Sequence, residues 1–131
     1  MTILYTNDVH TYIDNKSPKP TYAAIAALKK SIEDTGRDVL LVDAGDHIQG
    51  TAYGSMDDGA TIIELMNEAG YDLATPGNHE FDYGMARAKA VIREADFPYV
   101  SCNWSICVPA STFCPASSSS LWAAARLPLW A

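Results

Sequence analysis

Four short polar segments of this 131-residue chain each follow an apolar stretch that is typical of a buried β-strand. The segments are Asp8-Val9-His10, Gly45-Asp46, Gly77-Asn78-His79-Glu80 and Ser101-Cys102-Asn103. Carboxylate, imidazole and amide groups are ligands that hard or borderline divalent cations accept. Side chains delivered from several strand ends can converge on one point. The sequence therefore predicts a metal site, and the chemistry it favours is hydrolysis of a phosphate ester by a metal pair.

The segments between these polar residues predict alternating strands and helices. Short apolar runs predict strands over residues 3–6, 38–42, 71–75 and 97–101, and apolar residues at helical spacing predict helices over residues 21–34, 62–69 and 84–95. Repeated β-α-β units with right-handed crossovers place the carboxyl ends of parallel strands at one edge of a sheet. We therefore expect an α/β fold with a mostly parallel sheet, helices on both faces, and a loop over residues 45–59 that lines a substrate entrance.

Composition limits the possible partners. The chain has 16 Asp and Glu against 9 Lys and Arg, which gives a formal net charge of −7 and argues against binding a nucleic acid polymer. No apolar run reaches the length of a membrane span, and Met1 leads directly into an apolar strand without a basic signal-peptide region. The chain as written is thus expected to carry no membrane span and no signal peptide.

The end of the chain differs from the rest in composition. Residues 104–131 contain a single charged side chain, Arg126, together with a serine run over residues 117–120 and no clear period. We predict two parts: residues 1–103, which form the structured domain, and residues 104–131, an atypical tail that is non-native or disordered. The cysteines, three in number and crowded near this end, predict neither a disulfide framework nor a zinc site; they are Cys102, Cys107 and Cys114.

The polar segments resemble the sequence blocks of the metallophosphoesterase superfamily, in particular its branch of 5′-nucleotidases, UDP-sugar hydrolases and 2′,3′-cyclic nucleotide phosphodiesterases. Three blocks occur in the family's order: Thr6-Asn7-Asp8-Val9-His10, Asp43-Ala44-Gly45-Asp46 and Gly77-Asn78-His79-Glu80-Phe81-Asp82-Tyr83-Gly84. The resemblance extends from Ile3 to Asn103. It implies a partial calcineurin-like β-sandwich flanked by helices, of which this chain holds the first β-α-β units.

The resemblance also implies a set of metal ligands. Asp8 and His10 would bind a first divalent ion, Asp46 would bridge both ions, and Asn78 would bind the second. A carboxylate suits the bridging role, since paired ions in such sites lie about 3.5–4 Å apart and activate a water that attacks phosphorus. Oxygen and nitrogen ligands admit Mn, Zn, Co, Mg or Fe, so the identity of the two ions stays open.

Other residues take supporting roles in the same resemblance. His79 would be the catalytic histidine beside the metal pair, and Asp82 would orient its imidazole. Hydrogen bonds from further residues support such ligands, and we assign this role to Asp43, Glu80 and Asn103.

Simpler interpretations exist for each residue. Asp8 could cap a helix, Asn78 could form a turn after Pro-Gly, and Glu80 could be a charge at a helix start. Asp43 competes with Asp46 for the bridging role. We interpret His47 as a loop residue near the site. The combination of all three blocks favours the metal site over these separate explanations.

The resemblance does not extend to all the metal ligands of the family. Family members supply two more metal-binding histidines from a later part of the domain, whereas this chain has only His10, His47 and His79. It also lacks the carboxy-terminal half of the catalytic domain and the domain that selects the substrate. We therefore expect an inactive amino-terminal fragment of a nucleotide hydrolase. Family relatives are commonly exported to the periplasm or cell wall, so the resemblance implies that location.

Two alternatives come from other classes of protein. The chain could be a non-catalytic α/β module that binds a single metal ion through Asp8, His10 and Asp46. Asp8 could also be a phosphoacceptor of the haloacid-dehalogenase or receiver type, but a haloacid-dehalogenase site needs a second Asp where His10 stands. Neither alternative explains the segment from Gly77 to Glu80.

Overall fold

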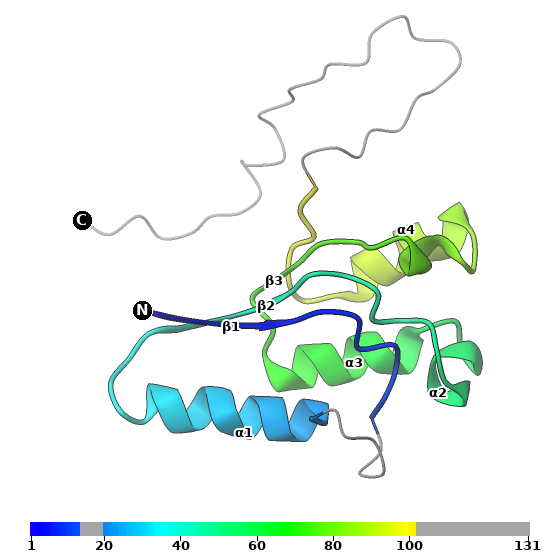
Figure 1. The fold of residues 1–131 in the computed structure, drawn as a ribbon. Coiled ribbons are helices and arrows are strands. Elements are labelled where there is room, and N and C mark those ends of the chain that lie inside the picture. Colours follow the sequence, from blue (N-terminus) through cyan, green and yellow to red (C-terminus); the bar gives the residue numbers. More distant parts are fainter. Residues whose placement is uncertain (14–19, 102–131) are drawn as a thin grey trace, which may run out of the picture.

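The computed structural model describes residues 1–13 and 20–101 (Figure 1). The elements follow in the order β1 (Thr2–Thr6), α1 (Tyr22–Glu33), β2 (Val39–Asp43), α2 (Ala52–Ser55), α3 (Ala60–Ala69), β3 (Leu73–Ala74), the 3₁₀ helix η1 (His79–Phe81) and α4 (Met85–Glu94). The predicted tail over residues 104–131, the three cysteines and Asn103 lie outside the described residues.

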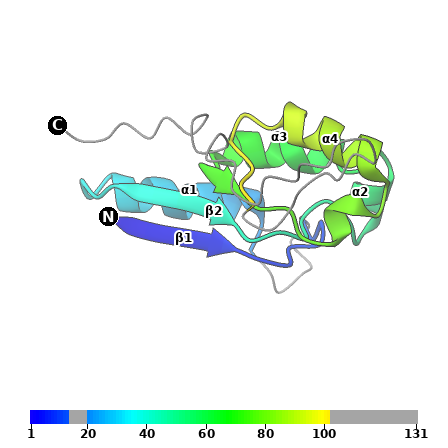
Figure 2. The same ribbon diagram turned by 90° about the horizontal axis from the view of Figure 1, so that it is seen from above.

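Three parallel strands form the sheet, in the order β1-β2-β3. β1 and β2 pair along their whole length, from Thr2 opposite Val39 to Thr6 opposite Asp43 (Figure 2). Parallel pairing directs all three carboxyl ends to the same edge. The predicted α/β class with a parallel sheet is confirmed, and the polar segments after β1 and β2 start together at this edge.

The third and fourth predicted strands are shorter than expected. β3 has only two residues, Leu73 and Ala74, and begins two residues later than predicted. At its start the backbone N–H of Leu41 donates to the side chain of Asp72 (2.8 Å). In place of a strand over residues 97–101, the structure has an isolated parallel bridge between Ala74 and Tyr99. This bridge still places Tyr99 beside the sheet.

Local signals set the helix limits. Thr21 begins α1 by accepting a hydrogen bond from the backbone N–H of Ala24 (3.2 Å). α3 lies between Gly59 and Gly70, which adopt left-handed conformations with φ of 88° and 74°. α2 was not predicted and occupies part of the expected loop over residues 45–59. A helix of four residues is too short to show a helical period in the sequence.

The core lies between the sheet and the helices. Its largest fully buried side chains include Leu41 of β2, Ile62, Ile63 and Met66 of α3, and Val91 of α4. α1 and α3 lie on the same side of the strands in Figure 1. On the other face of β1, Ile3 and Tyr5 are 56% and 74% exposed. Among the described residues, the expected cover on both faces is therefore present along β1 on one face only.

Candidate metal centre

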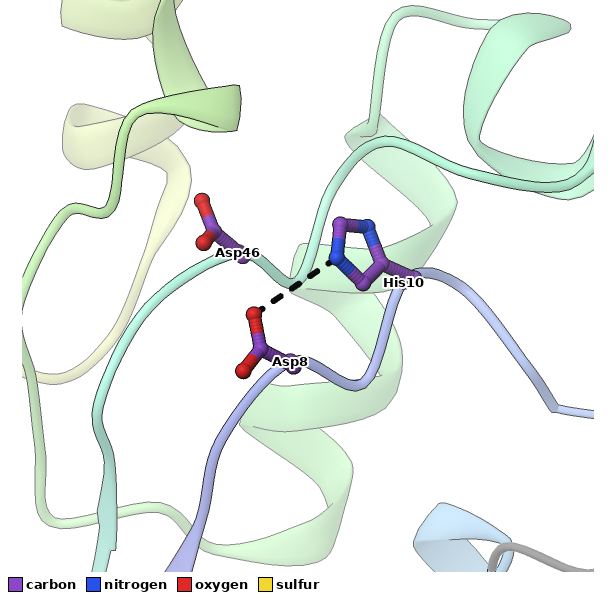
Figure 3. Close-up of side chains that lie close together, drawn as sticks. All are labelled: Asp8, His10 and Asp46. Atoms are coloured by element: carbon purple, nitrogen blue, oxygen red, sulfur yellow. Dashed lines mark ion pairs between the residues drawn. The ribbon is translucent and has the colours of Figure 1, made fainter.

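Three of the predicted ligands lie together at the carboxyl edge of the sheet. Each of Asp8, His10 and Asp46 offers one ligand atom, and these atoms all lie within 4.8 Å of one another (Figure 3). Asp8 Oδ1 is 3.6 Å from His10 Nε2. Asp8 is exposed and the other two are half-buried, so solvent and small solutes can reach the group. Two strand ends thus deliver three ligand groups to one accessible point.

The chemistry of these donors fits a divalent ion. Two carboxylates and one imidazole supply oxygen and nitrogen atoms without any sulfur, which suits Mn, Zn, Co, Mg or Fe. The two carboxylates also supply the negative charge that a cation requires. The donor set therefore matches the predicted type of cofactor without choosing among these metals.

All three residues of this group have an uncommon backbone conformation. The φ angles of Asp8, His10 and Asp46 are 51°, 49° and 60°. Residues other than glycine adopt this left-handed region rarely, and such conformations gather at functional sites when the surrounding structure maintains them. Here the surrounding structure includes backbone hydrogen bonds between the two loops, from Asp8 N to Gly45 O (3.1 Å) and from His10 N to Asp46 O (3.0 Å).

Glycines permit the loops to approach this closely. A Cβ atom at Gly45 would lie 2.6 Å from the backbone nitrogen of Gly77, and one at Gly77 would collide with the Asp46 carboxylate. A Cβ at Gly50 would collide with the backbone carbonyl of His10. Only glycine fits at these contacts, and they bring the loops after β1, β2 and β3 together.

His79 lies beside the three ligands. Its backbone N–H donates to Asp46 Oδ1 (2.8 Å), and its ring centroid is 5.1 Å from that of His10 in an edge-on arrangement. His79 Nδ1 is 2.7 Å from Asp82 Oδ2, and both side chains are exposed to about a third or more, at 35% and 40%. The hydrogen bond with Asp82 is the main cause that raises the pKa of His79 above its ordinary value.

Asn78 is the residue directly before η1, and it is exposed. Its position beside His79 places it at the same edge of the sheet. Its predicted role as a ligand of a second ion stays a prediction.

A buried carboxylate joins two of the loops. Glu80 is 1% exposed, and its oxygens accept hydrogen bonds from the backbone N–H groups of Asp46 (2.9 Å), His47 (2.8 Å) and Gly77 (2.5 Å). This burial excludes a solvated charge at a helix start, and the predicted support of a metal ligand by Glu80 stays a prediction.

Asp43 lies beneath the site. It is 3% exposed and accepts hydrogen bonds from the backbone N–H of Gly45 (2.8 Å) and from the hydroxyl of Thr6. Its carboxylate thus forms hydrogen bonds in the interior, and it is Asp46 rather than Asp43 that lies in the group with Asp8 and His10.

His47 lies in the loop directly after Asp46, as predicted, but the sequence did not indicate that its side chain is buried. His47 is fully buried, with Nδ1 2.8 Å from Asp43 Oδ1 and Nε2 2.7 Å from the hydroxyl of Tyr99. Burial by itself lowers the pKa of His47, but the hydrogen bond with Asp43 and the charge of Glu80 outweigh burial and raise it. Nothing in the sequence pointed to these contacts, because a spacing of four residues brings side chains together on a helix, whereas Asp43 ends a strand and His47 lies in a loop.

Comparisons with known proteins show the family of this chain. Residues 1–121 match the family model for calcineurin-like phosphoesterases. The chain is 37% identical over 114 residues to a snake venom 5′-nucleotidase from Gloydius brevicauda, and 36% identical over 115 residues to a 5′-nucleotidase from Homo sapiens. Both alignments cover 79% of this chain, and they cover 19% and 20% of the two relatives.

Solved structures of 5′-nucleotidases also match this chain. The crystal structure of a 5′-nucleotidase precursor from Thermus thermophilus matches with a TM-score of 0.70 and 29% identity, over 77% of this chain and 22% of that one. This chain belongs to the calcineurin-like phosphoesterase family. Its relatives include 5′-nucleotidases, which are hydrolases, and it spans about a fifth of their length.

Proposed function

We propose that this chain supplies part of the metal centre of a 5′-nucleotidase-like phosphoester hydrolase. Asp8, His10 and Asp46 would hold a divalent ion, and Asp46 with Asn78 would hold a second. The observation that carries the proposal is the convergence of the first three ligand groups within 4.8 Å, at the edge where His79 also lies.

Asp46 has a central role in the proposed metal centre. Bound divalent ions would activate a water and stabilise the charge that develops on the phosphoryl oxygens. Asp46 is positioned between the loops after β1 and β3, because its backbone oxygen binds His10 and its carboxylate binds the His79 N–H. These contacts support its proposed role as the bridging ligand.

His79 would act on the phosphoryl group or the leaving oxygen. Asp82 binds its Nδ1, which leaves Nε2 as the nitrogen that can meet a substrate. In the metal-free chain the hydrogen bond with Asp82 raises the pKa of His79, and a ring protonated in this way would donate to an oxygen that gains negative charge. The exposure of this pair is consistent with direct contact with a small phosphoester.

The substrate class and location are inferred from relatives. The matched relatives are 5′-nucleotidases, so we propose a nucleotide as substrate. One relative is a venom protein, which is compatible with an exported location for this family branch. No helix among residues 1–13 and 20–101 combines the length and the apolar character required to cross a bilayer.

We further propose that the 131-residue chain on its own binds metal without sustained turnover. Its three histidines are His10 and His79 at the site and His47, which is buried against Asp43 and Tyr99 and faces away from solvent. No other imidazole of this chain is left to complete a second metal site.

Metal titration combined with a hydrolysis assay tests the proposal. We expect calorimetry to detect Mn²⁺ binding that Asp46→Ala abolishes, with Asp38→Ala at the amino end of β2 as a control that binds normally. Wild-type chain that binds no Mn²⁺, Co²⁺ or Zn²⁺ contradicts the metal centre.

The same experiment decides on a second candidate, a non-catalytic module that holds a single ion. The three-ligand group of Asp8, His10 and Asp46 favours this candidate for the isolated chain. One ion per chain without AMP hydrolysis agrees with it. AMP turnover that Asp46→Ala abolishes would contradict both the module and the proposed inactivity of the isolated chain.

A further inference from the structure

The turn that carries Asp46 requires support from outside its own backbone. Gly45 and Asp46 are consecutive residues with positive φ, at 102° and 60°. A non-glycine residue in this region is held there by its surroundings rather than by its own preference. The question is which contacts hold this turn.

A hydrogen bond between side chains closes the turn. Asp43, at the end of β2, contacts His47 through Oδ1 and Nδ1 at 2.8 Å, and both side chains have no exposed surface. The same oxygen of Asp43 accepts from the backbone N–H of Gly45. The contact therefore joins the residues on either side of the Gly45-Asp46 turn and limits how far it can open.

A second contact fixes the far side of the same ring. His47 Nε2 is 2.7 Å from the hydroxyl of Tyr99, and the two ring centroids are 5.8 Å apart. Tyr99 is itself held beside β3 through its bridge with Ala74. With both ring nitrogens bound, the imidazole cannot rotate without breaking a buried hydrogen bond.

We propose that His47 is a positioning residue for Asp46: its imidazole, held by Asp43 and Tyr99, fixes the strained turn that directs the Asp46 carboxylate toward Asp8 and His10. The inference depends on the proposed function, because it concerns a ligand of the proposed metal centre. His47 and Asp46 are adjacent in the chain, yet one is buried and the other is half-buried among the ligands. Movement of the first therefore moves the second.

Substitution of His47 tests the inference in the full 131-residue chain. His47→Leu removes both polar contacts, whereas the amide of His47→Gln can donate to Asp43 and accept from Tyr99. We expect His47→Leu to weaken Mn²⁺ binding by about 10- to 100-fold, as loss of outer contacts of a metal ligand does, and His47→Gln to restore most of the affinity. Ile25→Ala is the matched control, since it removes a buried side chain from α1, which contributes nothing to the site.

Amide exchange separates this inference from the proposed metal centre. The backbone N–H groups of Asp46 and His47 donate to Glu80, and we expect both to exchange faster in His47→Leu than in wild type or His47→Gln. A wild-type chain that binds none of Mn²⁺, Co²⁺ and Zn²⁺ refutes the proposed function, and the exchange rates then decide the inference about His47 alone. The inference is overturned if the two amides exchange in His47→Leu at the wild-type rate. It is also overturned if Ile25→Ala accelerates their exchange as much as His47→Leu does.

Discussion

The carboxyl edge of the sheet holds two histidine–aspartate pairs that share their chemistry and differ in their surroundings. His47 and Asp43 have no exposed side-chain surface, and their ring contact measures 2.8 Å. His79 and Asp82 make the same kind of contact at 2.7 Å with 35% and 40% of their side chains exposed. The pairs are connected, because Asp46 lies next to His47 in the chain and accepts from the backbone of His79.

The difference shows how one pairing can serve two purposes. In the buried pair, the hydrogen bonds replace water that the groups have lost, so removing a partner leaves an unpaired polar group or charge in the interior. In the exposed pair, water can replace either partner, so the contact adds little to folding but controls the protonation of a ring that a substrate can reach. Burial rather than residue type assigns the first pair to structure and the second to proposed chemistry.

The largest expected effect comes from breaking the buried pair. Asp43→Ala removes the acceptor for His47, for Gly45 N–H and for the Thr6 hydroxyl, and we expect it to lower the free energy of unfolding by about 3–5 kcal/mol. Urea denaturation followed by circular dichroism measures this loss. Asp82→Ala is the matched control in the exposed pair and should stay within about 0.5 kcal/mol of wild type. Equal losses in the two variants would remove the distinction between the pairs.

A smaller effect is expected from the far side of the buried ring. Tyr99→Phe leaves His47 Nε2 without its partner, and we expect a loss of about 1–3 kcal/mol in the free energy of unfolding. Tyr5→Phe alters a side chain that is 74% exposed and should be neutral in the same denaturation assay. A neutral Tyr99→Phe would mean that Asp43 alone holds the imidazole.

The pH dependence of stability sharpens the comparison further. The pKa of His47 in the folded state is raised above its ordinary value of 6.5. Protonation of His47 therefore stabilises the fold fully below pH 6.5, and this stabilisation is lost as pH rises through the raised pKa. A tenfold difference in proton affinity between the folded and unfolded states corresponds to about 1.4 kcal/mol of stability. We expect the stability difference between wild type and His47→Gln to shrink with rising pH, as measured by urea denaturation from pH 5 upward. A constant difference would contradict a raised pKa.

The smallest effect on folding, and a clear one on protonation, is expected in the exposed pair. Asp82→Asn replaces the carboxylate whose hydrogen bond, and to a smaller extent whose charge, raises the pKa of His79, so this pKa should fall toward its ordinary value while stability stays unchanged. Nuclear magnetic resonance titration of the His79 ring in the metal-free chain measures the change. The His47 ring serves as an internal control, because its partners are Asp43 and Tyr99. An unchanged His79 titration would exclude Asp82 as the cause.

The fold was largely predictable where periodicity is strong. Apolar residues of α1 and α3 recur at helical spacing, and the runs in β1 and β2 are long enough to identify strands. Prediction was weaker for β3, which has only two residues, and for α2, which has only one turn. Elements this short leave no periodic pattern.

The candidate site was predictable in part. The strand-end positions of Asp8, His10 and Asp46 followed from the order of apolar and polar segments, and the structure brings these three together. The left-handed conformations of the same residues were not visible in the sequence. They result from hydrogen bonds between loops that are far apart in the chain.

The sequence alone determined which groups are available at the sheet edge, because parallel strands that follow an apolar pattern must end on the same side. It also determined that this chain contributes three imidazoles, those of His10, His47 and His79. The tertiary structure decided their roles. His47 and His79 are equally polar as residues, and only packing by Tyr99, Glu80 and the core buries the first while the second stays in contact with water. Burial raises the free energy of an unpaired charge by roughly several kcal/mol, and that energy depends on neighbours that the local sequence does not contain.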